Sequence, residues 1–147
     1  MRLQNKVAIV TGGAKGLGQA MSELFAKHGA KVIAVDMMDL TYSHPDVEFY
    51  KLNVANSDDV AKFGEYVFAK YGKADILVNN AGITRDAMTR KMTDEQFDLV
   101  ISVNLKGVFN MARVFGPKME EAGYGSIINI SSVVGVYGNI GQANYAA

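Results

Sequence analysis

The sequence predicts an α/β fold in which a doubly wound parallel sheet of five strands carries helices on both faces. Short runs of consecutive apolar residues alternate along the chain with segments whose apolar residues recur at helical spacing. Such runs are typical of parallel strands covered on both faces, and strict strand–helix alternation with right-handed crossovers gives a doubly wound sheet. No repeat, low-complexity tract or linker divides the 147 residues, so we expect one domain over residues 1–147.

The first half of the chain supplies three of the strands. Apolar runs predict them at residues 7–10, 32–35 and 47–54. Between the first two, apolar residues recur at helical spacing, and Gly29 stands where a C-cap glycine belongs. After the third, Asn56 is suited to cap a helix that runs to about Tyr71. The pattern is that of two βα units followed by a third strand.

The second half supplies a strand on each side of one long helix. The strands are predicted at residues 76–78 and 127–130. Thr93 and Gln96 have the spacing of a capping box, which predicts that the helix begins there and extends to about 119–121.

The core face of this long helix is expected to be a single apolar stripe. The stripe consists of Phe97, Val100, Ile101, Leu105, Val108 and Phe109. Asn104 falls on it, where a buried amide either completes a core hydrogen bond or faces a polar cleft, and the residue types alone favour the first. Pro117 lies near the end of the helix and is expected to bend or finish it.

Charge and composition exclude several classes of function. The chain carries 15 Lys and Arg against 15 Asp and Glu, which gives no basic surplus for nucleic acid or an anionic membrane. It has no cysteine, so disulfides, thiol catalysis and cysteine-ligated metals are excluded, and its two histidines lack metal-ligand spacing. No apolar run is long enough for a signal peptide or a membrane helix. We therefore expect a cytoplasmic protein with no metal.

A glycine-rich turn joins the first strand to the first helix. Gly12, Gly16 and Gly18 permit a tight turn whose backbone N–H groups and helix N-terminus can approach a pyrophosphate. Asp36 ends the second strand, where a carboxylate can accept hydrogen bonds from both hydroxyls of an adenine-linked ribose. Strand, turn, helix and acid together favour a dinucleotide site over a plain strand-end turn.

The residues around this turn also bear on the kind of nucleotide. Asp36 repels a 2′-phosphate and so favours NAD(H), whereas Lys15 can pair with a phosphate, which leaves NADP(H) open. A nucleoside-triphosphate loop is excluded, because Lys15 is followed by Gly16 and Leu17 rather than by the Ser or Thr that holds magnesium. Nothing downstream resembles a dedicated methyl-transfer site.

A serine and a tyrosine follow the fifth strand. Ser132 lies at the carboxyl edge of the sheet, where open α/β sheets bind ligands, and Tyr145 is expected on the opening turn of the next helix. Together they offer hydroxyl donors to a carbonyl oxygen that becomes negative during hydride addition. The residue pattern alone equally allows Ser132 as a turn residue and Tyr145 as a half-buried aromatic side chain.

These segments together resemble the short-chain dehydrogenase/reductase family over essentially the whole chain. Residues 11–18 have its T-G-x-x-x-G-x-G form, and residues 79–82 have its N-N-A-G segment. Asn104, Ser132 and Tyr145 match its catalytic Asn, Ser and Tyr. The resemblance implies the N-terminal part of a Rossmann-type domain, and an enzyme that transfers hydride between a nicotinamide and a carbonyl or alcohol.

The resemblance also implies roles for single residues. Tyr145 is the implied general acid in reduction and general base in oxidation, Ser132 holds the carbonyl oxygen, and Asn104 fixes a water in the proton relay. The residues implied at the cofactor are Gly12, Lys15, Gly16, Leu17, Gly18, Asp36, Asn53, Val54, Asn80, Ala81 and Gly82. Many relatives carry at position 53 an Asp that touches the adenine, and Asn80 mainly braces the central strands.

Within the family, three segments resemble the bacterial 3-oxoacyl-acyl-carrier-protein reductases of fatty acid biosynthesis. These segments are residues 80–86, 132–135 and 141–145. They imply a small carbonyl or alcohol substrate, with an acyl thioester as one candidate, and we expect a homo-oligomer. Such reductases usually prefer NADPH and dock an acidic carrier through basic residues, and Asp36 and the acidic start of residues 120–125 argue against both features here.

The family's catalytic unit is Y-x-x-x-K, whereas this sequence reads Tyr145-Ala146-Ala147 and stops. We therefore expect a domain truncated at its C-terminal end, before the catalytic lysine. Two functions stay open, a short-chain NAD(P)-dependent oxidoreductase and a non-catalytic dinucleotide-binding fragment that folds only with a partner or its missing half. The apolar fifth strand is expected at an open edge of the sheet, where it can pair or aggregate.

Overall fold

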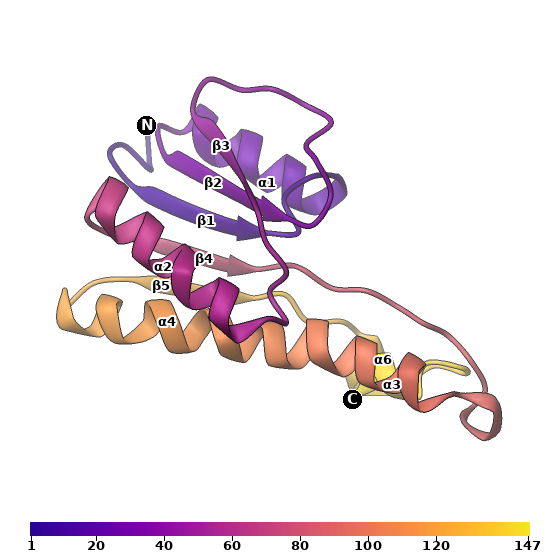
Figure 1. Ribbon diagram of the computed structural model, residues 1–147. Coiled ribbons are helices and arrows are strands. Elements are labelled where there is room, and N and C mark those ends of the chain that lie inside the picture. The colour runs from indigo at the N-terminus through magenta and orange to yellow at the C-terminus, as the bar shows by residue number, and fades with distance from the viewer.

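The computed structural model describes residues 1–147, which form one parallel sheet with helices on both of its faces (Figure 1). The strands are β1 (Val7–Thr11), β2 (Lys31–Asp36), β3 (Val47–Lys51), β4 (Ile76–Asn79) and β5 (Ser126–Asn129). They lie in the order β3-β2-β1-β4-β5, and every neighbouring pair is parallel. The predicted α/β fold is confirmed, and the carboxyl ends of all five strands meet at one edge.

Helices cover both faces of this sheet (Figure 1). They are α1 (Gly16–Lys27), α2 (Ser57–Tyr71), η1 (Thr89–Lys91), α3 (Asp94–Ile101), η2 (Ser102–Lys106), α4 (Gly107–Glu121), α5 (Val134–Tyr137) and α6 (Ala143–Ala146). Helix α1 lies on one face, and α2 and α4 pack together on the other. None of the helices combines the length and the apolarity that crossing a membrane requires.

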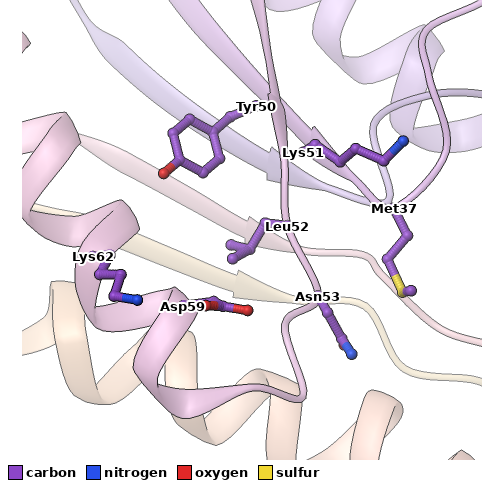
Figure 2. Close-up of a pocket in the computed structure, with 7 residues that line it drawn as sticks. All are labelled: Met37, Tyr50, Lys51, Leu52, Asn53, Asp59 and Lys62. Atoms are coloured by element: carbon purple, nitrogen blue, oxygen red, sulfur yellow. The ribbon is translucent and has the colours of Figure 1, made fainter.

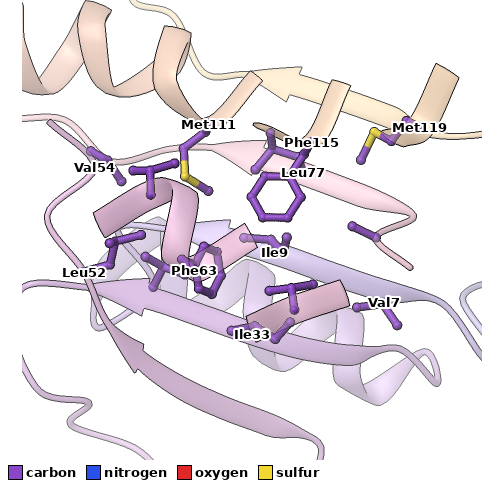
Figure 3. Packing of buried hydrophobic residues seen from close by; sticks show 14 residues of the cluster. Val7, Ile9, Ile33, Leu52, Val54, Phe63, Leu77, Met111, Phe115 and Met119 are labelled. Atoms are coloured by element: carbon purple, nitrogen blue, oxygen red, sulfur yellow. The ribbon is translucent and has the colours of Figure 1, made fainter. Parts of the chain in front are cut away.

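Successive side chains of a strand point to opposite faces, so β1 contributes to two cores. Val7 and Ile9 belong to the cluster under α2 and α4, whereas Ala8 and Val10 belong to the cluster under α1. Figure 3 shows the larger cluster, in which Phe63 of α2 and Phe115 of α4 meet edge to face with ring centroids 5.7 Å apart. Burial of each such side chain stabilises the fold by roughly 1.5–3 kcal/mol.

Local capping residues mark the beginnings and ends of helices where the sequence predicts them. The Asn56 side chain accepts hydrogen bonds from the first turn of α2, and Gly72 follows that helix in the left-handed conformation. Thr93 and Gln96 form the predicted capping box of α3. Gly29 follows α1 with a φ of 96°, as a glycine beyond a C-cap does.

Strand β3 is shorter than predicted, because it ends at Lys51 rather than at Val54. The Asn53 side chain accepts a hydrogen bond from the N–H of Ala55 at 3.0 Å, and the Asn53 carbonyl accepts one from the N–H of Asn56 at 3.0 Å. This local turn competes with extension of the ladder. Leu52 and Val54 therefore belong to the loop after β3, and their side chains are still buried in the core.

The predicted apolar stripe of the long helix is wrong for Phe97, Leu105 and Phe109, whereas Val100 is buried as predicted. Phe97, Leu105 and Phe109 have exposed fractions of 41%, 58% and 56%, whereas the buried side chains of α4 include Met111 and Phe115. The stripe assumes an unbroken period of 3.6 residues, but η2 is a π turn, whose i→i+5 hydrogen bonds take up extra residues. The face that α3 buries is therefore not continued by the same spacing in α4.

The prediction that Pro117 could finish the long helix is wrong, because α4 continues through it to Glu121.

Strand β5 lies at the edge of the sheet and pairs only with β4. Its Ile127 and Ile128 are about two-fifths exposed. The predicted edge position of this strand is confirmed.

Asp75 fastens the amino ends of three strands. Its carboxylate accepts a hydrogen bond from the N–H of Val7 at 2.8 Å, and its carbonyl accepts one from the N–H of Ser126 at 3.0 Å. Lys73 and Lys6 lie 3.0 and 3.5 Å from the carboxylate. Partial burial raises the pKa of Asp75, but the hydrogen bonds from Val7 and Lys73 and the charges of both lysines outweigh it, so the pKa lies below its usual value.

Acid is therefore expected to remove the stability that ionised Asp75 contributes. Because its pKa is lower in the folded than in the unfolded protein, this contribution is fully present above about pH 3.9 and disappears as pH falls through the folded value. Asp75→Asn should cost stability at pH 7, and the deficit should shrink below pH 4 in urea unfolding. Asp98→Asn, at an exposed position of α3, is the control. A deficit for Asp75→Asn that does not change with pH would contradict this account.

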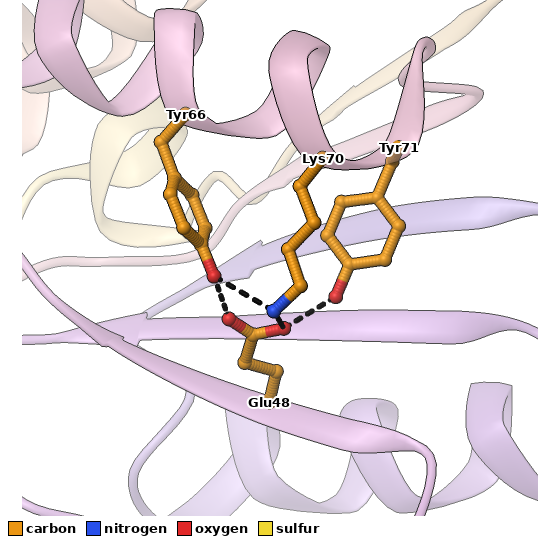
Figure 4. A network of polar contacts seen from close by, with 4 residues as sticks. All are labelled: Glu48, Tyr66, Lys70 and Tyr71. Atoms are coloured by element: carbon orange, nitrogen blue, oxygen red, sulfur yellow. Dashed lines mark hydrogen bonds and ion pairs between the residues drawn. The ribbon is translucent and has the colours of Figure 1, made fainter.

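A second polar cluster joins β3 to α2 (Figure 4). Glu48 accepts hydrogen bonds from the hydroxyls of Tyr66 and Tyr71 and from Lys70 Nζ, the last at 2.6 Å. Burial raises the pKa of Glu48, but these hydrogen bonds outweigh it and leave the pKa lowered. Burial and the Glu48 carboxylate raise the pKa of Tyr71 to about 12. The cluster fixes α2 against the edge strand β3.

Candidate functional site

The glycine turn between β1 and α1 is built so that larger side chains do not fit. Gly12 and Gly16 have positive φ angles of 65° and 57°, and a Cβ on Gly18 would lie 1.9 Å from the carbonyl oxygen of Gly12. Lys15 and Leu17 are exposed between them. These two residues therefore offer the turn their backbone groups, while their side chains face away from the protein core.

The first turn of α1 differs from those of α2 and α3. Asn56 and Thr93 cap α2 and α3 with their side chains, whereas no side chain caps α1 at Lys15. The first N–H groups of a helix have no intrahelical partner and attract anions. The backbone at Gly16–Gly18 therefore fits a pyrophosphate.

Asp36 faces the glycine turn from the end of β2. One carboxylate oxygen accepts a hydrogen bond from the N–H of Ala14 at 3.0 Å, and the other accepts one from the N–H of Met38 at 3.1 Å. Each oxygen keeps capacity for a further hydrogen bond, because a carboxylate oxygen can accept two. Asp36 thus orders the turn and remains able to bind ribose hydroxyls.

The segment after Asp36 also contacts the turn, which the sequence did not indicate. The Tyr42 hydroxyl donates to the carbonyl of Gly13 at 2.9 Å, and the Thr41 hydroxyl donates to the carbonyl of Ala14 at 3.3 Å. Burial raises the pKa of Tyr42. Loop residues far from any motif therefore hold two peptide groups of the turn.

Thr11 and Asn80 join the turn to the segment after β4. The Thr11 hydroxyl oxygen accepts hydrogen bonds from the N–H groups of Asn80 and Ala81, both at 3.0 Å. The Asn80 side chain donates to the carbonyls of Thr11 and Gly12 at 3.0 and 3.3 Å. Asn80 thus connects the two central strands at their carboxyl ends, which agrees with the bracing role that the resemblance implies.

Asn53 and Val54 lie in the loop between β3 and α2. Asn53 lines a cavity of about 320 Å³ with Met37, Tyr50, Lys51, Leu52, Asp59 and Lys62 (Figure 2). Val54 is buried, and its carbonyl accepts a hydrogen bond from the Asn110 side chain of α4 at 2.9 Å. Since Met37 directly follows Asp36, this cavity begins beside the end of β2 that faces the glycine turn.

Asn104, Ser132 and Tyr145 line one cavity of about 160 Å³. The π turn η2 supplies Asn104, the loop after β5 supplies Ser132, and α6 supplies Tyr145. The Ser132 hydroxyl accepts a hydrogen bond from the N–H of Val134 at 3.2 Å. The structure therefore brings together three side chains that lie up to 41 positions apart in the sequence.

Asn104 is fixed by the backbone of the segment after β4. Its side-chain oxygen accepts from the N–H of Ile83 at 2.9 Å, and its NH₂ group donates to the carbonyl of Ile83 at 3.0 Å. Gly82 lies beside it, with a Cβ position 3.6 Å from the side-chain oxygen. The half-buried Asn104 side chain combines both predicted alternatives. Its hydrogen bonds are internal, and it also lines the cavity.

Two further site-building residues escaped the sequence interpretation. Asn144 is 1% exposed and hydrogen-bonds segments around the 160 Å³ cavity, and Thr11 had been considered only as part of the glycine motif. Neither has a local sequence signal, because the Asn144 NH₂ group and the Thr11 hydroxyl bond residues that lie more than 45 positions away. No three His, Asp or Glu side chains are grouped so that they could hold a metal ion.

Comparisons with known proteins identify the family of this chain. Residues 6–147 match the family described as short chain dehydrogenase. The chain is 49% identical to a 3-oxoacyl-[acyl-carrier-protein] reductase of Thermotoga maritima, 41% identical to one of Chlamydia muridarum, and 41% identical to an uncharacterized oxidoreductase of Mycobacterium bovis. These matches cover 99–100% of this chain and 62–63% of each relative. The chain, which spans less than two thirds of the length of these relatives, belongs to the short-chain dehydrogenase family.

Proposed function

We propose that residues 1–147 form the dinucleotide-binding unit of an NAD(P)-dependent oxidoreductase, which transfers hydride between a nicotinamide and a carbonyl or alcohol. The observation that carries this proposal is the cavity shared by Asn104, Ser132 and Tyr145 at the sheet edge that also holds the glycine turn. Ligands of open α/β sheets bind at this edge. The names of the reductase relatives support a 3-oxoacyl thioester as the substrate class.

The residues present fit a dinucleotide. The uncapped backbone of Gly16–Gly18 suits the pyrophosphate, and the Asp36 carboxylate suits the adenine-linked ribose. Asn53 lines the cavity that begins beside Asp36, and we propose that the adenine lies there, next to Asn53 and Val54. Asn80, Ala81 and Gly82 continue the surface from the turn toward Asn104. When bound, the nicotinamide supplies or accepts the hydride, and the chain's own residues handle the proton and the oxygen.

In the proposed reduction, the Ser132 hydroxyl donates a hydrogen bond to the substrate carbonyl oxygen. Tyr145 donates a proton to this oxygen as its negative charge develops, and in the oxidation of an alcohol it accepts the same proton. Asn104 lies on the wall of the same cavity, where its anchored amide can hold the water that returns a proton to Tyr145. Hydroxyl and amide donors fixed in advance stabilise developing charge without reorganisation.

Binding and turnover together test the proposal. The expected result is that the protein binds NADH, detected by the fluorescence of the nicotinamide, and oxidises it when acetoacetyl-CoA, a 3-oxoacyl thioester, or a simple ketone is added. Binding without oxidation would favour a non-catalytic dinucleotide-binding unit. Failure of both NADH and NADPH to bind, or to raise the melting temperature, would overturn the proposal altogether.

Asp36→Ala is expected to weaken NADH binding by roughly 10–100-fold relative to NADPH, because hydrogen bonds to a charged acceptor contribute about 1.5–3 kcal/mol. Since Asp36 also holds the N–H of Ala14, both cofactors should lose some affinity, and only their ratio reports the ribose contact. Dissociation constants from fluorescence titration measure it. Asp39→Ala removes an exposed acid that pairs with Lys51 and should leave the ratio unchanged. An unchanged ratio in Asp36→Ala would exclude the ribose role.

We also propose that the protein works as a homo-oligomer, which follows from the resemblance and not from a contact in the structure. Equilibrium sedimentation measures the number of copies directly. A monomer at the concentrations used for turnover would exclude this part of the proposal.

A further inference from the structure

Asn144 is a buried amide that directly precedes the proposed catalytic tyrosine. It is 1% exposed. Its NH₂ group donates to the carbonyl of Arg85 at 2.8 Å and to the carbonyl of Gln96 at 3.1 Å, and its oxygen lies 2.8 Å from the N–H of Tyr145. The side chain thus uses both of its protons on two separate segments, the one after β4 and the helix α3.

Two more contacts attach the same stretch to the segment after β4. The Gln142 side chain donates to the Asp86 carboxylate, with both oxygens at 3.2 Å, and the N–H of Ala87 donates to the carbonyl of Gly141 at 2.9 Å. Gly141 has a φ of 79°, which lets the chain turn at this contact. Residues 141–144 are therefore held against residues 85–87.

Helix α6, which carries Tyr145, begins without a side-chain cap. Its first turn is held to the rest of the protein by the contacts of neighbouring residues, and Asn144 makes the most buried of these contacts. The direction in which α6 presents the Tyr145 side chain therefore depends on Asn144.

The segment after β4 also fixes the second member of the proposed catalytic group. Ile83 provides both hydrogen-bonding partners of the Asn104 side chain, and Arg85 lies two positions later. The distance between Asn104 and Tyr145 is thus set through a stretch of three residues. A shift of this stretch would move both side chains of the 160 Å³ cavity.

We propose that Asn144 is a positioning residue, which holds Tyr145 in the geometry for proton transfer by anchoring α6 to the backbone of Arg85 and Gln96. The proposal rests on the proposed function, because it assigns the proton to Tyr145. It predicts that Asn144 affects the chemical step and leaves the glycine turn, on the far side of the site, undisturbed. A misplacement of about 1 Å at a reacting group can cost on the order of 100-fold in rate.

The first experiment compares Asn144→Ala with Asn139→Ala, which removes an exposed asparagine of the same loop that hydrogen-bonds only Gln142. Asn144→Ala should lower kcat for acetoacetyl-CoA on the order of 100-fold while the NADH dissociation constant and KM change by less than about threefold. Asn139→Ala should keep the original kcat. Asn144→Asp keeps the acceptor for the N–H of Tyr145 but loses both donors. The kcat of this variant should therefore fall at least as far as that of Asn144→Ala.

A double substitution separates positioning from general support of the fold. If Asn144 acts through Tyr145, adding Asn144→Ala to Tyr145→Phe should cause no further loss of the residual rate. If the double variant instead loses as much additional rate as Asn144→Ala loses alone, Asn144 contributes independently of Tyr145, and the proposal is overturned. The same holds if kcat is unchanged in Asn144→Ala, or if NADH affinity falls as far as kcat.

A second measurement does not depend on turnover. With 3-fluorotyrosine at position 145, the fluorine NMR resonance should shift or broaden in Asn144→Ala and stay in place in Asn139→Ala. If the unchanged protein oxidises no NADH, the proposed function fails while this resonance still decides whether Asn144 positions Tyr145. If Asn144→Ala does not fold, Gln142→Ala removes the less buried anchor to Asp86 and should move the resonance in the same way, and an unmoved resonance would overturn the proposal.

Discussion

Replacement of Tyr145 by phenylalanine is expected to lower hydride transfer by roughly 10²–10⁴-fold, the range that a positioned general acid or base contributes. Phenylalanine keeps the ring that lines the cavity but removes the only group of this residue that can give a proton to the substrate oxygen. NADH affinity should change little, because in the proposed reaction the hydroxyl serves the reacting oxygen, and the substitution leaves the glycine turn unaffected. The loss of NADH absorbance with acetoacetyl-CoA measures the rate, and fluorescence titration measures the affinity.

Tyr137→Phe is the matched control for this substitution. Tyr137 belongs to α5 in the same loop region and is 86% exposed, so loss of its hydroxyl should leave turnover as it is. Undiminished hydride transfer in Tyr145→Phe would refute Tyr145 as the acid and would leave the Ser132 hydroxyl as the next candidate. Equal losses in both variants would instead indicate a general disturbance of the loop after β5.

Gly18→Ala should raise the dinucleotide dissociation constant by roughly 100-fold. The added Cβ would lie 1.9 Å from the carbonyl oxygen of Gly12, a separation at which the backbone must move. Such overpacking costs about 1–3 kcal/mol and occasionally more, and each 1.4 kcal/mol is tenfold in affinity. Because Gly12 also contacts Asn80 and Ala81, the displaced turn cannot simply slide toward β4.

Gly116→Ala provides the control with the same chemical change. Gly116 lies inside α4, where a Cβ would meet only Ile127 Cδ1 at the ordinary contact distance of 3.8 Å. Alanine in a helix interior is favoured over glycine by roughly 0.5–1 kcal/mol, so this variant should bind normally and unfold at higher urea concentration. Normal NADH binding by Gly18→Ala would show that the turn does not carry the cofactor.

Local patterns were sufficient to predict most of the secondary structure. Apolar runs located all five strands, and cap residues such as Asn56 and Thr93 located the starts of α2 and α3, because both signals act within a few residues. The errors also have local causes. The side-chain turn of Asn53 shortened β3, and the π turn η2 invalidated the extrapolated apolar stripe, since no residue type announces a change of helical period.

Some residues of the candidate site could be predicted from the sequence, and others could not. Asn104, Ser132 and Tyr145 could be selected from short motifs, and the structure places them around one cavity. Asn144 and Tyr42 could not, because they act through backbone carbonyls that have no sequence signature. The residues that support the site depend on which distant segments meet, and that information exists only in the folded chain.

The strand order gives neighbouring segments of the sheet very different separations along the chain. Lys31 and Asp46, at the starts of β2 and β3, are 15 residues apart, whereas the Asp75 carboxylate and the N–H of Val7 that hydrogen-bond β4 to β1 are 68 residues apart. Loop-closure entropy grows only with the logarithm of length, so the longer closure costs only about 1.3 kcal/mol more. It does, however, delay the contact, because distant segments meet more slowly than near ones.

The glycine turn and Asn80, which are 68–69 residues apart, meet across this same junction between β1 and β4. The proposed binding surface is therefore complete only when these two distant segments of the chain have met. A dinucleotide present at 100 times its dissociation constant would stabilise the docked form by about 2.7 kcal/mol. The ligand would then hold the two sides of the junction together, and we expect it to slow proteolytic cleavage at the glycine turn and at Asn80 more strongly than cleavage in the connection from β2 to β3.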